Sequence, residues 1–378
     1  MSSSSAPPKA RYVMIAGFLG AGTTTAVARL ARRLTDQGLR VGLITNDQGR
    51  HLVDTAMLRA HGFATEEIPG GCFCCRFNSL MEASQALTAS ARPDVFIAEP
   101  VGSCTDLVAT VTYPLRRLYG EAFTVAPLSV LVDPVRARRI FGLECGGNFS
   151  DKVLYIYRKQ LEEADLIVVS KCDLLDAARL EELRQVIAQR YPRAEILAAS
   201  PREGTNIEAW FARLTGSEQS PRATMDMDYD LYADGEALLG WLNCTVQFSA
   251  QQPFAADRLL QALAGEIQRR LRAERAEIAH LKMTLSPEGG LGDIAAVNVV
   301  RNDYVPELSL HLDEPVPGGQ LILNLRAEAA PDLLDAVVRE ALTAVTKDFH
   351  TLAATLDHLE RFRPGRPNPT HRDEQRTN

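Results

Sequence analysis

No apolar run in this sequence approaches the roughly 18 to 20 residues that a membrane-spanning helix needs. The first ten residues are rich in serine and contain no apolar core of the kind found in a secretory signal. Positive charge is not in excess either, since 41 lysines and arginines stand against 48 acids. These absences argue against a membrane protein and against a broad nucleic-acid-binding surface, and we expect a cytoplasmic protein.

The sequence also lacks the even cysteine count of a disulfide framework, because it has seven cysteines in 378 residues. Three of the seven fall within the four positions 72–75, which indicates metal or redox chemistry. The other four are isolated in sequence, and we expect ordinary apolar positions for them. These four are Cys104, Cys145, Cys172 and Cys244.

Short apolar runs alternate with helical patterns from residue 11 to about residue 216. Several runs are apolar on consecutive residues, as parallel strands covered on both faces would be. The pattern predicts an α/β fold, a doubly wound domain with a mainly parallel sheet and ligands bound at one edge. The expected strands are 12–15, 40–45, 95–98, 128–132, 166–169 and 195–198.

Composition divides the whole chain further. A smaller α+β domain is expected after the first, because its strands and helices mix without strict alternation. The last residues are rich in proline and charge, which is typical of disorder. We expect a flexible tail at 1–10, the first domain at 11–216, an acidic linker at 217–240, the α+β domain at 241–348, and a terminal helix and disordered tail at 349–378.

A glycine-rich segment follows the first expected strand and precedes a helix over 26–34. This context is that of a phosphate-binding loop, whose backbone N–H groups and helix N-terminus hold a di- or triphosphate. We therefore expect a nucleotide here. The residues assigned to it are Gly17, Gly20, Ala21, Gly22, Thr23, Thr24 and Thr25.

One residue departs from the phosphate-loop pattern, which requires lysine where this chain has Thr23. Threonine carries no charge, and a hydrogen bond to a charged group is worth roughly 1.5–3 kcal/mol. We expect weaker nucleotide binding and slow hydrolysis unless another cation substitutes. Arg50 and Arg76 are candidates by sequence, and the alternative is that both are solvated surface arginines.

Two carboxylates close expected strands at the same edge as this loop. Asp47 and Glu99 are the predicted catalytic residues, and with the Thr24 hydroxyl they are the predicted Mg²⁺ ligands. Glu99 would position Mg²⁺ or the attacking water, while Gly102 could offer its N–H to a γ-phosphate. The alternative for Asp47 is a turn-forming residue.

A third polar cluster ends the expected strand at 166–169. The Asp173 carboxylate suits guanine, because it accepts from N1–H and the exocyclic amino group, while the Lys171 stem packs on the base. Ser170 occupies the position where asparagine is usual. The cluster therefore favours GTP, and the alternative is an ordinary strand-end lysine and aspartate.

The crowded thiols of Cys72, Cys74 and Cys75 can converge on one ion, for which Zn²⁺ or another thiophilic or borderline divalent metal is suited. Three ligands leave one position for water, for a partner's side chain, or for His51 or His61. The alternatives are a structural zinc knuckle, a buried apolar group, or thiol redox sensing.

In this order the motifs resemble the CobW-like P-loop GTPases, relatives of the urease and hydrogenase nickel-insertion GTPases and of the nitrile hydratase activators. The resemblance is strong over 12–215 and loose beyond. It implies a P-loop NTPase fold, GTP with Mg²⁺, slow hydrolysis, and delivery of a metal or metallocofactor to a client metalloprotein or cofactor-biosynthesis enzyme. It assigns Thr24 and Glu99 to Mg²⁺ or water, Asp173 to guanine, and the three cysteines to the cargo metal.

Two functional readings stay open at this point. The first is a GTP-dependent metallochaperone, and the second is a non-hydrolysing nucleotide-binding adaptor or metal reservoir, for which Thr23 is the evidence. Residues 45–47 look more like the nickel-insertion relatives, which leaves the metal undecided. The sequence also leaves open whether the protein forms a homodimer.

Overall fold

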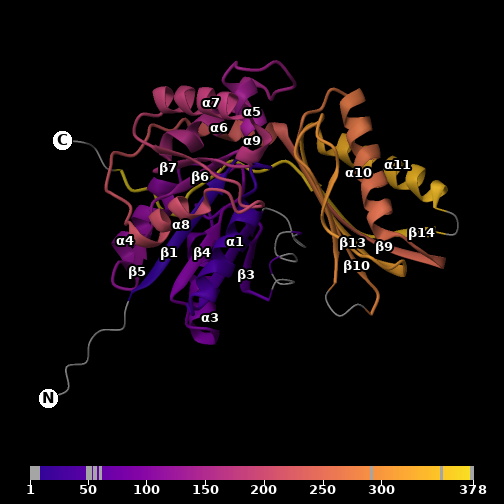
Figure 1. Ribbon diagram of the computed structural model, residues 1–378, viewed down its shortest axis with the longest axis horizontal. Coiled ribbons are helices and arrows are strands. Elements are labelled where there is room, and N and C mark those ends of the chain that lie inside the picture. The colour runs from indigo at the N-terminus through magenta and orange to yellow at the C-terminus, as the bar shows by residue number, and fades with distance from the viewer. Residues whose placement is uncertain are drawn as a thin grey trace.

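The computed structural model describes residues 9–47, 53, 58, 62–289, 293–349 and 352–374. It contains two sheets, each with its own helices, that lie side by side (Figure 1). None of the helices in the described ranges combines the length and apolar composition that a bilayer crossing requires.

The first sheet confirms the predicted doubly wound fold, since its strand pairs are all parallel. Its strands are β1 (Ala10–Gly17), β2 (Val41–Asp47), β3 (Ala64–Pro69), β4 (Val95–Glu99), β5 (Phe123–Val125), β6 (Ser129–Val132), β7 (Leu166–Val169) and β8 (Glu195–Ala198). The order is β3-β2-β4-β1-β6-β7-β8, with β5 also paired to β1. Sequence reasoning missed β3, an edge strand with two glutamates, and β5, which has three residues.

Helices cover both faces of this sheet, as the alternation along β1 shows. Val13 and Ile15 join a core with α1 and α8, whereas Tyr12 and Met14 join one with α3, α6 and α7. The helical elements are α1 (Thr23–Asp36), α3 (Phe77–Ser90), η1 (Val108–Thr112), α4 (Tyr113–Tyr119), α5 (Pro134–Ile140), α6 (Asp151–Glu163), η2 (Cys172–Leu174), α7 (Ala177–Arg190), α8 (Ile207–Gly216) and α9 (Tyr229–Leu238).

The second sheet is antiparallel, with the order β12-β11-β10-β13-β9-β14, and two helices pack on one of its faces (Figure 1). This is the predicted α+β domain. Its strands are β9 (Leu239–Phe254), β10 (Ile278–Pro287), β11 (Ala295–Val299), β12 (Glu307–Leu310), β13 (Val316–Glu328) and β14 (Leu352–Phe362). The helices are α10 (Ala256–Ala273) and α11 (Pro331–Asp348).

The other face of the second sheet is polar and packs on the first domain. Along β10, Leu281 and Met283 enter the core under α10 and α11, so His280 and Lys282 project from the opposite face. On the same side the fully buried Arg326 guanidinium lies 3.7 Å from the centre of the Trp241 ring, and that ring belongs to the first domain's core.

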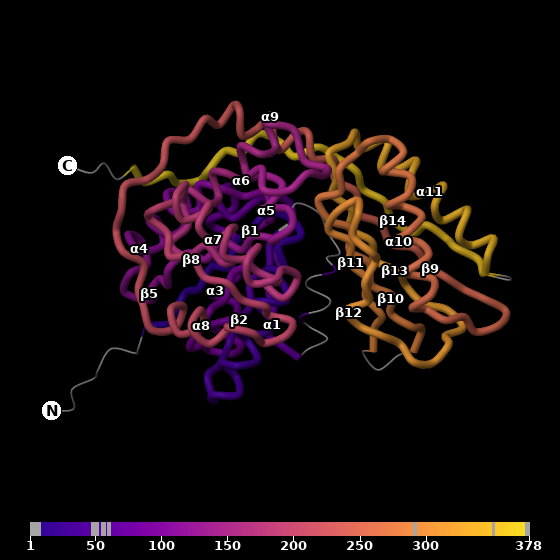
Figure 2. Tube along the Cα trace, turned by 45° about the horizontal axis from the view of Figure 1, so that its top comes forward, coloured from indigo at the N-terminus to yellow at the C-terminus, as the bar shows by residue number. Residues whose placement is uncertain are grey.

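Two stretches differ from the sequence-based expectation. Helix α9 lies inside the expected linker and packs closely on α6, since a Cβ on Gly235 would lie 2.4 Å from the Lys152 carbonyl. In place of a terminal helix, residues 352–362 form β14, which pairs with β9. The chain then returns across the first domain (Figure 2), where Thr370 N–H donates to the Cys74 carbonyl at 2.8 Å. Contacts with distant segments order both stretches, and composition does not reveal such contacts.

Candidate nucleotide and metal sites

The predicted phosphate-binding loop joins β1 to α1 in a strongly curved path. Gly20 and Gly22 have φ values of 83° and 92°, in the left-handed region that favours glycine. Gly22 is the N-cap of α1, and the helix has no acidic residue in its first turn. The loop therefore presents helical N–H groups, and an anion bound there would meet no neighbouring negative charge from that turn.

Both threonines at the start of α1 contact one carboxylate. The hydroxyls of Thr23 and Thr24 donate to Glu99 Oε1 at 2.6 and 2.9 Å. Glu99 comes from the end of β4 and is 6% exposed. Hydroxyl and carboxylate oxygens are the donors that Mg²⁺ prefers, so Thr24 and Glu99 fit the ion expected there.

Other sequence-based candidates near this loop have different outcomes. Asp47 closes β2 at the same sheet edge, but its side chain lies outside the described structure. Arg50, His51 and His61 also fall outside the described residues. The Arg76 guanidinium donates to the Gly70 carbonyl at 3.1 Å, and it therefore braces the cysteine loop.

The predicted guanine motif, residues 170–173, contacts the phosphate loop through its first two residues. Ser170 Oγ donates to the Ala21 carbonyl at 2.7 Å, and Lys171 Nζ donates to the Gly20 carbonyl at 2.8 Å. Asp173 lines a cavity that adjoins these contacts. The motif and the phosphate loop thus border the same space, as expected for two parts of one nucleotide site.

The cavity has a volume of about 150 Å³ and lies between the two domains. A smaller cavity of about 40 Å³ adjoins it, with Thr23, Asn46, Glu99 and Gly102 in its wall. Sequence reasoning missed part of the lining. From the loop after β8 come Ser200, Pro201 and Arg202, and from the second domain come His280, Leu281, Lys282, Asn298, Val299, Val300, Tyr304, Glu307 and Ser309.

A strand ending at the same sheet edge was a usable sequence signal for the loop after β8. No sequence signal marked the second-domain residues, because they reach the cavity only through domain packing. Arg202 forms an ion pair with Glu307 across the two domains, and the Glu307 carboxylate also accepts a hydrogen bond from the Tyr304 hydroxyl. These three residues lie together in the cavity wall.

A buried carboxylate anchors the second domain beside the nucleotide motifs. Asp133, at the start of α5, accepts from Lys171 Nζ at 2.9 Å and from Arg301 Nη1 at 3.0 Å. Burial alone would raise the pKa of Asp133, but the charges of Lys171 and Arg301 and the Arg136 N–H outweigh it and lower that pKa. The Arg136 guanidinium also donates to the Ile278 carbonyl of β10 at 3.1 Å.

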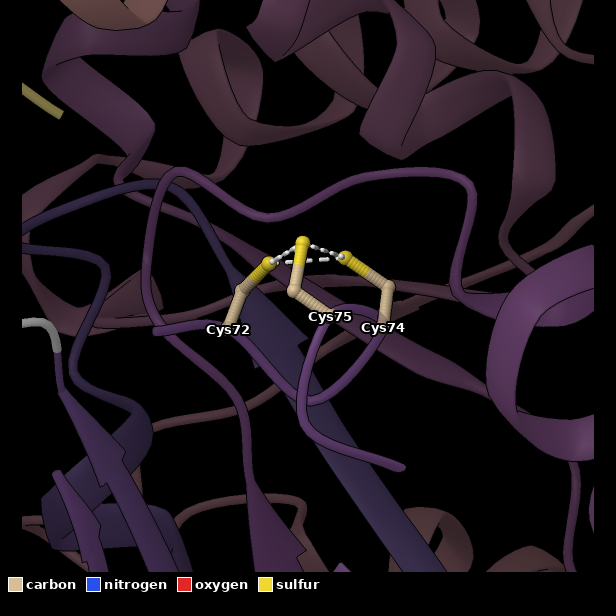
Figure 3. A group of neighbouring side chains, drawn as sticks. All are labelled: Cys72, Cys74 and Cys75. Atoms are coloured by element: carbon tan, nitrogen blue, oxygen red, sulfur yellow. Dashed lines mark hydrogen bonds between the residues drawn. The ribbon is translucent and has the colours of Figure 1, made fainter. Parts of the chain in front are cut away.

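The three clustered cysteines lie in the loop between β3 and α3, and their sulfurs point toward one another (Figure 3). Cys72 Sγ lies 2.7 Å from Cys74 Sγ and 3.3 Å from Cys75 Sγ. A tight turn brings them together, since the N–H groups of Cys75 and Arg76 donate to the Cys72 carbonyl. Three sulfurs within 4.8 Å of one another can bind a thiophilic ion.

Cys104, which is isolated in sequence, lies beside this cluster. Hydrogen bonds from Cys104, Cys74 and Cys75 lower the pKa of the Cys72 thiol, which favours the thiolate that binds metal. Cys104 occupies a buried position in the apolar core, as expected for an isolated cysteine, and it also lies next to the clustered thiols. Cys104 adds a fourth sulfur near Cys72 and Cys74, and it is 1% exposed.

Two sets of contacts link the smaller cavity and the phosphate loop to the segments that carry the cysteines. The Asn46 amide donates to the carbonyls of Ile68 and Gly71 at 2.9 and 2.6 Å, directly before Cys72, while Asn46 also lines the smaller cavity. In the loop after β4, a Cβ on Gly102 would lie 3.1 Å from the Leu19 backbone nitrogen, so this loop touches the phosphate loop two residues before Cys104.

Residues 11–198 match the family model described as the nucleotide-binding domain of CobW, HypB and UreG. A zinc chaperone CobW from a Sinorhizobium species is 30% identical over 209 residues, which cover 48% of this chain and 56% of that protein. Zinc chaperone YeiR from Escherichia coli is 29% identical over 166 residues, covering 43% and 47%. The chain thus spans about half the length of these curated relatives.

Among solved structures, the Zn(II)-bound YjiA GTPase from E. coli is similar over 90% of this chain and 99% of that chain. Its sequence identity is 14% and its TM-score is 0.39.

Proposed function

Because residues 11–198 belong to the CobW/HypB/UreG family of nucleotide-binding domains, we propose that this protein is a GTP-binding metallochaperone whose nucleotide and metal sites are coupled. GTP is the proposed nucleotide, seated on residues 17–25 with its base near Asp173. Zn²⁺ is the proposed cargo, held by Cys72, Cys74 and Cys75. A client metalloprotein or cofactor-biosynthesis enzyme would receive the metal.

The observation that carries this proposal is the continuity between the two sites. The loop after β4 follows Glu99, touches the phosphate loop at Gly102 and reaches Cys104, whose thiol lies beside the sulfur cluster. A shift of this loop on binding a γ-phosphate would therefore move a sulfur as well. In nucleotide switches, loops that contact the γ-phosphate change conformation with the nucleotide state and so alter a distant site.

The chemistry at the phosphates follows from the residues that face them. Mg²⁺, where bound, would offset phosphate charge beside Thr24 and Glu99. The Glu99 carboxylate would hold the ion or a water, and the Gly102 N–H would donate to the γ-phosphate. Ser170 and Lys171 would keep the phosphate loop in its curved form through the carbonyls of Ala21 and Gly20.

The relatives named as zinc chaperones make zinc the first metal to test. We expect a non-hydrolysable GTP analogue with Mg²⁺ to change the zinc affinity of the protein, and zinc to change the affinity for the analogue by the same factor. Competition with a chromophoric chelator measures the first, and titration of a fluorescent analogue measures the second. Couplings of this type are about 5- to 150-fold.

Three variants sharpen this experiment. Cys75→Ser should weaken zinc binding, whereas Cys145→Ser, which changes an exposed and isolated cysteine, should not. Asn46→Ala should keep both sites but bring the coupling factor toward one, because it removes the hydrogen bonds to Ile68 and Gly71. Equal zinc affinity with and without the analogue in the unmodified protein would contradict the proposed coupling.

A non-hydrolysing nucleotide-binding adaptor or metal reservoir is the second candidate, and Thr23 is the observation that favours it. Single-turnover assays with GTP separate the two functions. Slow release of phosphate that depends on Glu99 supports a GTPase, and binding without release supports an adaptor.

A further inference from the structure

The phosphate loop lacks its own lysine, but a lysine from the other domain lies beside it. Lys282 Nζ donates to Thr24 Oγ1 at 3.4 Å, across 258 positions of sequence. The side chain extends from β10 of the second domain and lines both cavities at the nucleotide motifs. From this geometry we propose that Lys282 supplies the phosphate-binding charge that Thr23 does not.

The alternation of side chains along β10 explains why Lys282 faces the phosphate loop. In β10 its neighbours Leu281 and Met283 are fully buried in the second domain's core, which directs Lys282 to the opposite face. The residues opposite it on the adjacent strands are Asn298 and Asn324, which are polar and uncharged. Strand β10 also packs closely on the phosphate loop, since a Cβ on Gly20 would lie 3.0 Å from the Ala279 carbonyl oxygen.

Within the described part of the chain, two further cations line these cavities. Among the described lysines and arginines of the two linings, Lys171 is paired with Asp133 and Arg202 with Glu307. Lys282 is the one whose ammonium contacts the threonine proposed to lie beside the β- and γ-phosphates. Arg76, suggested by sequence alone, contacts the Gly70 carbonyl instead.

A second observation on the same strand indicates a ligand in this space. His280 is 7% exposed, lines both cavities, and its buried Nε2 has no hydrogen-bond partner among the described residues. A phosphate oxygen would satisfy a ring N–H there, since buried polar atoms are rarely left unpaired. The β10 face would thus give the anion one charged donor and one neutral donor.

The second domain then becomes part of the nucleotide site. A phosphate held between Thr24 and Lys282 would contact both domains at once, in the manner of cationic side chains supplied to phosphates from a separate element. Loss of the γ-phosphate would weaken this bridge. This inference rests on the proposed function, because it needs a nucleotide on the phosphate loop.

The test is a charge-relocation experiment on the full chain with a fluorescent non-hydrolysable GTP analogue and Mg²⁺. Lys282→Met should weaken binding by about 10- to 100-fold, the factor that one charge-assisted hydrogen bond represents. Lys282→Arg should retain most of the affinity. The matched control is Lys347→Met, which removes an exposed lysine on α11 and should leave affinity unchanged.

Moving the charge back to its usual place completes the design. Thr23→Lys in the Lys282→Met background should restore affinity to within several-fold of the unmodified protein. Thr23→Lys alone should gain little, because a cation already serves there. Thermal unfolding of each variant confirms that it is folded, and restored binding by the double variant excludes misfolding as the cause of the loss.

The outcomes separate this inference from the function on which it rests. If the unmodified protein binds no GTP analogue, the proposed function fails. If it binds and Lys282→Met binds equally, the role of Lys282 fails alone. Tighter binding by Lys282→Met would also overturn it, since the ammonium would then be competing with the magnesium-bound phosphate.

Discussion

At the scale of single residues, polar atoms close to the nucleotide motifs decide what the sites can do. The Thr23 hydroxyl donates to Glu99, but the side chain carries no charge. The Asn46 amide donates to two carbonyls in the segment before Cys72. A buried acid, Glu163, holds the loop after β4 from behind, because Thr105 Oγ1 and the Val108 N–H both donate to it. Each of these effects belongs to one side chain and can be tested by changing it.

Glu163 should make stability depend on pH. Burial and the nearby charge of Asp106 raise the pKa of Glu163 to about 8, against an ordinary value of 4.5. Between these values the folded protein holds a proton that the unfolded chain releases, so the free energy of unfolding falls as pH rises through this window. Urea unfolding of the metal-free protein near pH 5, 7 and 9 measures it.

The matched variant for this prediction is Glu163→Gln, which is neutral at every pH. Relative to the unmodified protein it should gain stability from about pH 5 to about pH 9. An unchanged difference between the two proteins across that range would show that the Glu163 carboxyl titrates normally.

At the scale of elements, the C-terminal segment after β14 is the piece whose role depends most on long-range contacts. Asn368 N–H donates to Cys75 Sγ at 3.2 Å, and Asp373 forms an ion pair with Arg117 of α4. Arg372 forms another with the buried Asp106. The segment therefore covers the outer side of the cysteine loop, which an extended tail free in solvent would not do.

Truncating the chain after residue 363 should expose the cysteine loop. We expect Cys75, which is half-buried, to react several-fold faster with a thiol reagent in the metal-free truncated protein, because the cover and the Asn368 hydrogen bond are lost. Cys145 is exposed in both proteins and serves as the internal reference. Peptide mapping after timed labelling gives both rates, and an equal Cys75 rate would mean that the segment does not protect it.

At the scale of the whole molecule, the domain interface builds the cavity in which we place the nucleotide. One wall is the phosphate loop with the predicted guanine motif, and the other is the polar face of the second sheet. Asp133 joins the two, since it pairs with Lys171 of the first domain and with Arg301 of the second. The position of the second domain thus sets the shape of the proposed GTP site.

Breaking this junction should affect stability and binding together. Arg301→Met leaves the Asp133 carboxylate buried with one cation fewer, and loss of one partner of a buried pair costs about 3 kcal/mol. We expect a lower free energy of unfolding and weaker binding of the GTP analogue. The control is Arg339→Met, which breaks an exposed pair with Asp335 on α11 and should cost less than about 1 kcal/mol.

A feature of this protein could be predicted from sequence when the residues that determine it are close together in the chain. The phosphate loop, the strand-end motifs and the cysteine turn are each set by neighbours within a few residues, where glycine conformation and strand periodicity act. All six strands expected in the first domain are present. Strand β14 and the ordered segment after it were not foreseen, because β9 and the first domain supply their partners.

By itself the sequence determined the fold class, the phosphate loop with its missing lysine, and three thiols on one turn. Only the tertiary structure brought Cys104 to those thiols and Lys282 to Thr24, since each pair is joined by packing between elements far apart in the chain. The physical reason is that local propensity depends on neighbours within one or two turns of the chain. Contacts between charges or between sulfurs depend instead on their distance in space, which only the fold sets.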